Sequence, residues 1–167
     1  MRIIKLFSVI IILFASSCVS EKEDGVYISD AMLYNLATNT SSFTYYKNDN
    51  DTLPADPLSP HGHFIRVRFN PKAVSAMNQN VSQLTSSYFP DESMIVKEVY
   101  DSRGGSLIVY AIMYKLHGAS NNGSGWVWNE MTASGDVFTS ADHKGEECVS
   151  CHSSGDHSDL VRTFALH

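Results

Sequence analysis

The chain has 167 residues, of which 43% are hydrophobic and 18% are charged, and its formal net charge is −6 with neutral histidines. This length predicts one domain that is large enough to bury a real core. The composition is ordinary for a globular protein and excludes disorder of the whole chain.

Residues 1–17 have the parts of a secretion signal. Arg2 and Lys5 carry positive charge, residues 6–14 are apolar, and small residues precede Cys18. The apolar run is too short to cross a bilayer comfortably, so we favour a cleaved signal over a transmembrane helix. Small residues directly before a cysteine resemble a bacterial lipobox, which implies cleavage before Cys18 and lipid attachment to its thiol. We therefore expect a lipid-anchored protein of the bacterial cell envelope, on the periplasmic or outer-membrane face.

The predicted mature chain has a tether over residues 18–26 and a single domain over residues 27–167. Loss of the two basic residues in the signal leaves ten basic and 18 acidic residues, a formal charge of −8. A nucleic acid is therefore not expected as a partner. The charged run at residues 21–24 is either a solvated linker or a signal for sorting to the outer surface. Only two cysteines remain beyond Cys18, and they lie three apart, which excludes a disulfide framework.

The first half of the domain predicts two helices, a loop and a strand. In chain order we expect a helix, an exposed loop, a half-buried strand and a second helix over residues 27–36, 47–62, 63–69 and 70–84. Ser29 or Asp30 is available to cap the first helix. Asn70 and Pro71 start the second helix as its cap and its first residue. We expect this second helix to pack on the sheet.

The second half predicts three more strands, over residues 94–100, 106–116 and 125–131. Between the first two, Arg103-Gly104-Gly105 favours a hairpin, so these strands should be antiparallel neighbours. In the last strand, Trp126 and Trp128 share a face because side chains alternate along a strand. The remainder of the chain, from Ala133 onward, is polar and rich in turns.

The run Cys148-Val149-Ser150-Cys151-His152 is the motif C-x-x-C-H, which is typical of c-type haem attachment. Two thiols one turn apart can add to the two vinyl groups on one porphyrin edge, and the next residue then places its imidazole under the iron. The export signal supplies the compartment in which this haem is attached. We therefore predict one covalent haem c, with His152 as an axial ligand of the iron.

Three other interpretations of the cysteine pair are weaker. A thioredoxin-like pair lies at the start of a helix after an early strand, whereas this pair lies near the C-terminus. A structural zinc ion needs four ligands, and the nearby His143, His157 and His167 lack the spacing of a metal site. A plain disulfide in a loop is the third alternative.

The sixth coordination position of the iron separates electron carriers from ligand-binding haem proteins. No methionine follows His152, and His157 is too near in sequence to reach the opposite face of the haem readily. A distal ligand would therefore come from the β-sheet region. The candidates are Lys97, Met94, Met113 and His63. We interpret His61 and His63 as loop and strand-start residues in preference to ligands.

Lys97 is unusual because it shares a strand face with the apolar Ile95 and Val99. Its ammonium group either enters a pocket or stands on an open face, and lysine usually keeps this group in water. Glu98 points to the opposite face of the same strand. Lys115 lies at a strand end, where we expect it to reach solvent.

The order of these features resembles the cytochrome P-460 family, which includes the cytochromes c′-beta. A His-Gly step precedes a strand that ends in Phe-Asn, and then follow Phe-Pro-Asp, a Val-Lys-Glu strand, an apolar strand ending in Met-Tyr-Lys and a Trp-rich strand. C-x-x-C-H and the step Asp159-Leu160-Val161 complete the match, over roughly residues 27–164. The resemblance implies an α+β fold, mostly an antiparallel sheet with a few helices packed on it, and usually a homodimer.

The resemblance also implies a five-coordinate haem c with a largely apolar distal pocket. In the enzymes of the family a lysine bonds to the porphyrin and supports oxidation of hydroxylamine to nitric oxide or nitrous oxide, and Lys97 matches that lysine. Relatives without the cross-link bind nitric oxide and carbon monoxide. The enzymes also carry a distal carboxylate on the strand after the lysine strand as a proton acceptor. The matching position here is near Ala111, and the absence of an acid on that strand argues against efficient hydroxylamine oxidation.

Three functional hypotheses follow. We favour a mono-haem protein with an open distal site that binds nitric oxide or a related small ligand. The second hypothesis is an oxidoreductase acting on hydroxylamine or nitric oxide, and the third is an electron-transfer cytochrome with a redox partner protein. Two more residues are candidates for haem contacts: Phe89 as a cap on the pocket and Arg66 as a partner of the propionates.

Overall fold

The computed structural model describes residues 25–55, 59–62 and 64–167. The predicted signal over residues 1–17, the lipidation site Cys18, the charged run at residues 21–24 and His63 lie outside the described residues. No helix in the described part of the chain is long and apolar enough to span a membrane.

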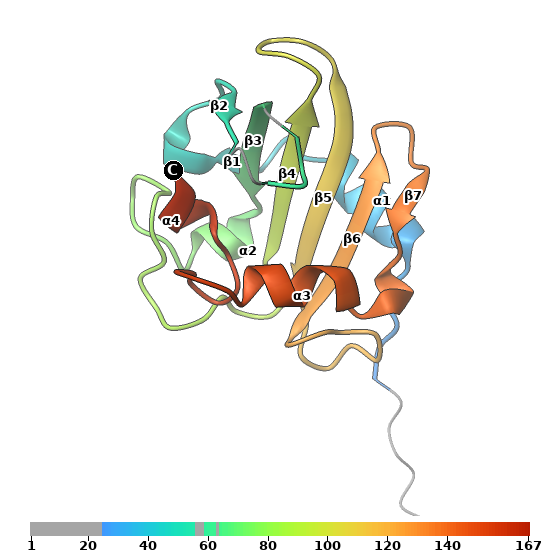
Figure 1. The fold of residues 1–167 in the computed structure, drawn as a ribbon. Coiled ribbons are helices and arrows are strands. Elements are labelled where there is room, and N and C mark those ends of the chain that lie inside the picture. Colours follow the sequence, from blue (N-terminus) through green and yellow to red (C-terminus); the bar gives the residue numbers. More distant parts are fainter. Residues whose placement is uncertain (1–24, 56–58, 63) are drawn as a thin grey trace, which may run out of the picture.

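Within the described residues, an antiparallel sheet of seven strands forms the centre of the molecule (Figure 1). The strands are β1 (Thr44–Tyr45), β2 (Leu53–Pro54), β3 (Phe64–Phe69), β4 (Met94–Tyr100), β5 (Leu107–Lys115), β6 (Trp126–Thr132) and β7 (Val137–Thr139). Their order is β1-β3-β4-β5-β6-β7, and β2 also pairs with β3. The predicted α+β fold, the four long strands and the β4–β5 hairpin are confirmed.

Four α-helices accompany the sheet in the described residues. They are α1 (Asp30–Thr38), α2 (Pro71–Val74), α3 (Glu146–His152) and α4 (Thr163–Leu166), with short 3-10 turns at Tyr46–Asn48 and Ala141–His143. Helix α1 begins at Asp30 because Ser29 is its cap: the Ser29 hydroxyl accepts a hydrogen bond of 3.2 Å from the backbone N–H of Met32. The predicted cap is thus confirmed.

Helix α2 begins where the sequence predicts but is much shorter than expected. Asn70 caps it by accepting a hydrogen bond of 2.9 Å from the backbone N–H of Ala73. The helix ends at Val74, and the N–H groups of Ala76 and Met77 then bond to the carbonyls three residues before them. Farther along, Asn78 closes a turn in which its side-chain oxygen accepts a hydrogen bond of 2.9 Å from the backbone N–H of Ser82. The apolar residues assigned to the longer helix are still buried, at Met77, Val81 and Leu84. The spacing of these apolar residues therefore reflects their burial and does not indicate a helix.

The two faces of the sheet carry separate hydrophobic cores. Helix α1 covers one face, and α2, α3 and α4 lie over the other (Figure 1). The alternation in β4 shows this division, since Ile95 and Val99 belong to the core beneath α3 and α4, whereas Met94 and Val96 belong to the core beneath α1. Trp126 and Trp128 lie on the same face as Ile95, as predicted.

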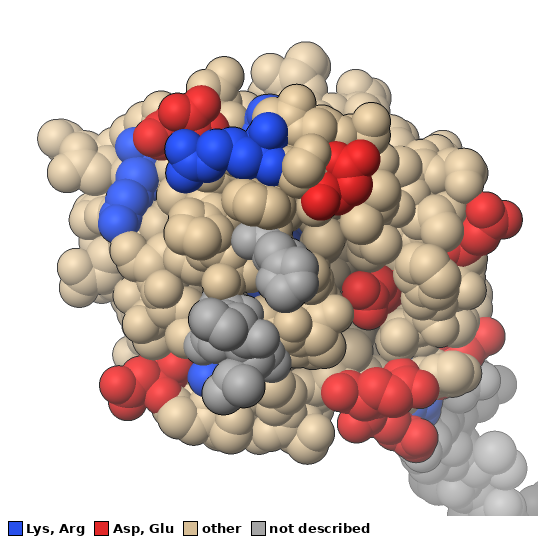
Figure 2. Space-filling view, turned by 45° about the horizontal axis from the view of Figure 1, so that its top comes forward, with Lys and Arg blue, Asp and Glu red and all other residues tan. Residues whose placement is uncertain are grey.

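Charged side chains of both signs lie on the face drawn in Figure 2. Lys and Arg side chains gather in one patch, and Asp and Glu side chains form separate patches around it. This face therefore carries both signs of charge, in neighbouring patches.

Candidate functional site

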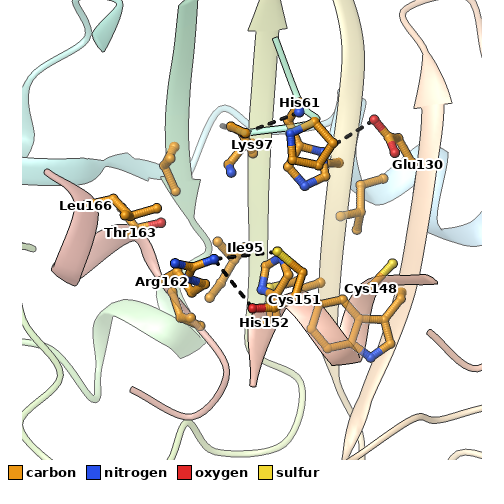
Figure 3. Close-up of a pocket in the computed structure, with 18 of the residues that line it drawn as sticks. His61, Ile95, Lys97, Glu130, Cys148, Cys151, His152, Arg162, Thr163 and Leu166 are labelled. Carbon is orange, nitrogen blue, oxygen red and sulfur yellow. Dashed lines mark hydrogen bonds and ion pairs between the residues drawn. The ribbon is translucent and has the colours of Figure 1, made fainter. Parts of the chain in front are cut away.

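A cavity of about 260 Å³ lies between the β3–β6 part of the sheet and the C-terminal segment that contains α3 and α4. Figure 3 shows the haem motif at one end of the cavity, and His61, Lys97 and Glu130 at the other. The structure thus brings together Lys97 and the motif, which are far apart in the sequence.

Helix α3 carries the motif and packs tightly on β6. It begins after Gly145, whose φ of +73° is a conformation that favours glycine. A Cβ at this position would lie 2.2 Å from Cδ1 of Trp128, so glycine also permits the close approach. The thiols of Cys148 and Cys151 are both free, with Cys148 half-buried and Cys151 exposed. Burial raises the pKa of Cys148 to about 11.

The imidazole of His152 is oriented for a metal ion. Its Nδ1 lies 2.8 Å from the carbonyl oxygen of Leu160. Because a carbonyl only accepts hydrogen bonds, Nδ1 is the protonated nitrogen and Nε2 carries the free lone pair. The ring packs edge-on against Trp128, with ring centroids 4.9 Å apart. Burial lowers the pKa of His152 to about 4, so the ring is neutral at physiological pH, as a ligand must be.

The carbonyl of Leu160 is held in place by a network around Asp159. Both residues have positive φ, at +50° for Asp159 and +66° for Leu160. The Asp159 carboxylate forms an ion pair of 2.7 Å with Lys115 and accepts a hydrogen bond of 2.9 Å from the backbone N–H of Phe89. The Asp159 carbonyl accepts a hydrogen bond of 3.0 Å from the indole of Trp126. The expectation that Lys115 reaches solvent is wrong, because Lys115 is 1% exposed and needs Asp159 as its partner.

Lys97 lines the cavity, so the first of the two alternatives for its ammonium group holds. It stands in a cross-strand row in which it pairs with Val67 on β3 and with Ala111 on β5. Burial lowers the pKa of Lys97 to about 8, and the negative charge of Glu130 acts in the opposite direction. The predicted cross-link between Lys97 and the porphyrin stays a prediction.

Glu130 is a cavity residue that the sequence reasoning missed. It lies on β6 directly opposite Ala111, and its carboxylate belongs to the same cross-strand row as Lys97. Position 111 does lack an acid, but the neighbouring strand supplies one. The signal was present in the sequence, because strict alternation after Trp126 and Trp128 places Glu130 on the same face.

His61 also enters the cavity, although the sequence reasoning treated it as a loop residue. Its Nδ1 lies 3.4 Å from Oε1 of Glu130, and its ring centroid lies 6.4 Å from that of His152. Gly62 follows with a φ of +85°, and a Cβ there would lie 2.8 Å from Cγ1 of Val99. Glycine therefore lets the chain pass closely over β4 while His61 points into the cavity.

Arg162 is the basic residue that lies beside the motif. Its Nη1 is 3.5 Å from both the carbonyl oxygen and the thiol sulfur of Cys151. Its Nε is buried and finds no hydrogen-bond partner in the described part of the chain. A buried donor without a partner fits a cavity that receives a group with acceptor oxygens, such as the propionates of a haem.

Two predicted contact residues do not line the cavity. The guanidinium of Arg66 lies 4.8 Å from the ring centroid of Tyr100, and Phe89 packs edge-on against Trp126 with centroids 5.8 Å apart. The roles predicted for both residues in haem binding stay predictions. The described residues contain no group of three or more His, Cys, Asp and Glu side chains arranged to hold a metal ion by themselves.

The residues present fit a haem on three counts: the two free thiols, the orientation of His152 and the unpartnered donor of Arg162. The family model for cytochrome P460 matches residues 39–163. A search of curated proteins finds no match. Since the matched region covers most of the chain, this protein belongs to the cytochrome P460 family of haem proteins.

Proposed function

We propose that this chain is an exported mono-haem c-type cytochrome that binds nitric oxide or a related small ligand at the iron. Membership of the cytochrome P460 family supports the haem. The observation that carries the proposal is the orientation of His152, whose Nδ1 is bonded to Leu160 so that Nε2 is left for an iron in the cavity. The end of the cavity that the sheet lines would then be left for a small ligand.

The chain's own side chains account for attachment and orientation of the haem. Cys148 and Cys151 would provide the two thiols, His152 would provide a nitrogen ligand for the iron, and Arg162 would provide the unpartnered donor for a propionate. The bound haem would supply an iron that takes small ligands and exchanges electrons.

The end of the cavity that the sheet lines combines apolar and charged side chains, which suits a small nitrogen oxide. Val67, Ile95 and Ala111 present apolar surface, and Lys97 and Glu130 are the charged groups beside it. Apolar walls exclude water and favour a neutral ligand, while the ammonium group of Lys97 is a hydrogen-bond donor to an oxygen atom.

Spectral titration tests this function. The full chain is produced with the c-type haem maturation system, reduced and titrated with nitric oxide. We expect haem that stays on the polypeptide in a denaturing gel and an absorption change that saturates at one equivalent. The double variant Cys148→Ser/Cys151→Ser should lose covalent haem. A wild-type chain without covalent haem contradicts the proposal, and so does a haem whose absorption spectrum does not change when nitric oxide is added.

Glu130 favours a second function, oxidation of hydroxylamine. A carboxylate in the same row as Lys97 is placed to accept a proton from a substrate with N–H and O–H groups. We expect Glu130→Gln to lower the rate of hydroxylamine oxidation, measured with an excess of an artificial electron acceptor, by about 100-fold, while nitric oxide binding persists. A wild-type protein that does not oxidise hydroxylamine contradicts this second function only.

The site of action that we propose is the cell envelope. The signal over residues 1–17 and lipid attachment at Cys18 support an anchored protein on the periplasmic or outer-membrane face. The resemblance described above supports a homodimer, and a redox partner protein would be required if the haem passes electrons onward.

A further inference from the structure

Two histidines face the same cavity with the same nitrogen free. His152 uses Nδ1 to bond the carbonyl of Leu160, and His61 turns Nδ1 toward the carboxylate of Glu130 at 3.4 Å. In both rings the acceptor fixes the proton on Nδ1 and leaves the Nε2 lone pair unused. A histidine whose other nitrogen meets a carboxylate or a carbonyl is the usual form of a metal-ligating histidine.

The two rings occupy successive inward-facing rows of the sheet. His152 packs on Trp128, and His61 pairs with Glu130, which is two residues further along β6. Residues two apart on a strand lie about 7 Å from one another. Figure 3 accordingly shows His152 and His61 at opposite ends of the cavity.

The separation of the rings decides between two roles for His61. Their centroids are 6.4 Å apart, with an interplanar angle of 71°. A metal–imidazole bond is about 2 Å and the ring centroid lies about 1 Å behind the nitrogen, so two imidazoles on opposite sides of one metal ion have centroids roughly 6 Å apart. If a small ligand lay between the metal ion and a hydrogen-bonding histidine, the separation would be roughly 8 to 9 Å.

We propose that His61 is the resting sixth ligand of the haem iron, opposite His152, and that an exogenous ligand binds by displacing it. The observed separation matches direct coordination and is too short for a ligand between the iron and the ring. This inference rests on the covalent haem of the proposed function and adds a control on access to the iron. It departs from the five-coordinate iron that the family resemblance implies, because His61 lies in the cavity of this chain.

The local chain explains why His61 is held in this position. The backbone N–H of His61 donates a hydrogen bond of 3.2 Å to the hydroxyl of Ser59, and Gly62 makes the close approach to Val99. Glu130 orients the imidazole from β6. Two contacts therefore hold His61, one through its backbone N–H and one through its side chain.

Displacement of His61 makes ligand binding a competition within the protein. A ligand must replace an iron–nitrogen bond, so binding is slower and weaker than at an open iron. Selectivity follows from this competition, because only ligands with strong affinity for haem iron, nitric oxide above all, replace the imidazole well.

The test is the spin state of the purified ferric haem, read by absorption and electron paramagnetic resonance. The full chain with covalent haem should be six-coordinate and low-spin. His61→Gln and His61→Ala should each be high-spin, and added imidazole should restore the low-spin spectrum of His61→Ala. In the reduced state, carbon monoxide should bind His61→Ala at least tenfold faster than wild type. The control His143→Gln replaces an exposed histidine outside the cavity and should resemble wild type.

The contrary outcomes are distinct. A wild-type chain that holds covalent haem but is high-spin overturns the inference and leaves the proposed function intact. A low-spin wild type that stays low-spin in His61→Gln, but becomes high-spin in Lys97→Met or His63→Gln, assigns another ligand and overturns it as well. A chain without covalent haem overturns the proposed function itself. Haem staining and far-ultraviolet circular dichroism confirm that each variant is folded and loaded.

Discussion

Asp159 is the residue that connects the haem motif to the sheet. Its carboxylate holds Lys115, its carbonyl receives the indole of Trp126, and its left-handed backbone turns the next carbonyl toward His152. Side-chain exposures of 2% for Lys115 and 5% for Asp159 make this a buried ion pair. Such a pair costs desolvation when it forms, but removal of one partner leaves an uncompensated charge in the core.

Asp159→Asn should therefore destabilise the fold strongly. We expect the free energy of unfolding, from denaturant titration, to fall by about 3 kcal/mol. Asp156→Asn is the matched control, since Asp156 is exposed on the same segment, and it should change stability by less than about 0.5 kcal/mol. Equal effects in the two variants would contradict the role given to the ion pair.

Lys97 should make stability depend on pH in the chain produced without haem. Its pKa in the fold is about 8, below the ordinary 10.5, so the unfolded chain binds more protons between these values and stability rises with pH across them. Below pH 8 the ammonium group of Lys97 is charged in the fold, and its burial destabilises the fold by the full amount. Lys97→Met should then stabilise the haem-free chain at pH 7 by about 3 kcal/mol, and by little near pH 11. Lys72→Met, at an exposed position on α2, should show no such pH-dependent gain.

At the scale of elements, the contact between α3 and β6 fixes the position of the motif. Gly145→Ala combines a positive φ with a Cβ that meets Trp128 at 2.2 Å. Gly104→Ala is a matched control, because Gly104 has a φ of +71° and open space around its Cβ. We expect Gly145→Ala to lose about 2 kcal/mol or more of stability and to hold less haem per chain, whereas Gly104→Ala should lose about 1 kcal/mol and keep its haem. Similar haem content in the two variants would contradict the contact.

Most of the elements could be predicted from the sequence, because alternation and turn residues are local signals. The strands β3 to β6, the β4–β5 turn and the caps Ser29 and Asn70 are of this kind. The length of α2 could not be predicted in the same way. Burial of Met77, Val81 and Leu84 follows helical spacing, but Asn78 closes a turn there and Met77 pairs with Leu84 as an antiparallel bridge.

The site could be predicted only in part, because some of its features are local in the sequence and others are not. The motif and Lys97 could be found because each has a spacing or a face that is visible in one segment. The pairings of Glu130 with His61 and of Lys115 with Asp159 join segments that are distant in the sequence, so they depend on strand order. A charged residue on an apolar strand face signals that a partner must exist, but the sequence does not say where.

At the scale of the whole molecule, the sheet separates two cores, and the cavity belongs to one of them. The face covered by α1 contains the buried ion pair of Arg68 and Glu98 at 2.6 Å, which lies opposite the cavity side. The ion pair and the core around it therefore lie on the other side of the sheet from the cavity and do not contact the motif. We expect the domain to fold and bind haem independently of its anchor.

The variant Cys18→Ser tests that independence. In cells with a lipoprotein pathway, wild type should sediment with the membrane fraction and incorporate labelled palmitate, and Cys18→Ser should incorporate none and keep the same haem spectrum. The comparison uses cell fractionation, palmitate labelling and haem staining. Soluble wild-type protein, or equal labelling of wild type and Cys18→Ser, contradicts a lipid anchor at Cys18.

The anchorage of Asp159 also has a consequence for the integrity of the chain. Residues 153–157 are exposed and lie between the motif and a C-terminal segment. The ion pair of Asp159 with Lys115 holds this segment, and so does the stacking of Phe164 on Phe69, whose ring centroids are 6.1 Å apart. A protease that cuts within this stretch would separate two fragments that remain docked. The nicked protein should elute at its original size and keep its colour, and only denaturation should release the C-terminal fragment.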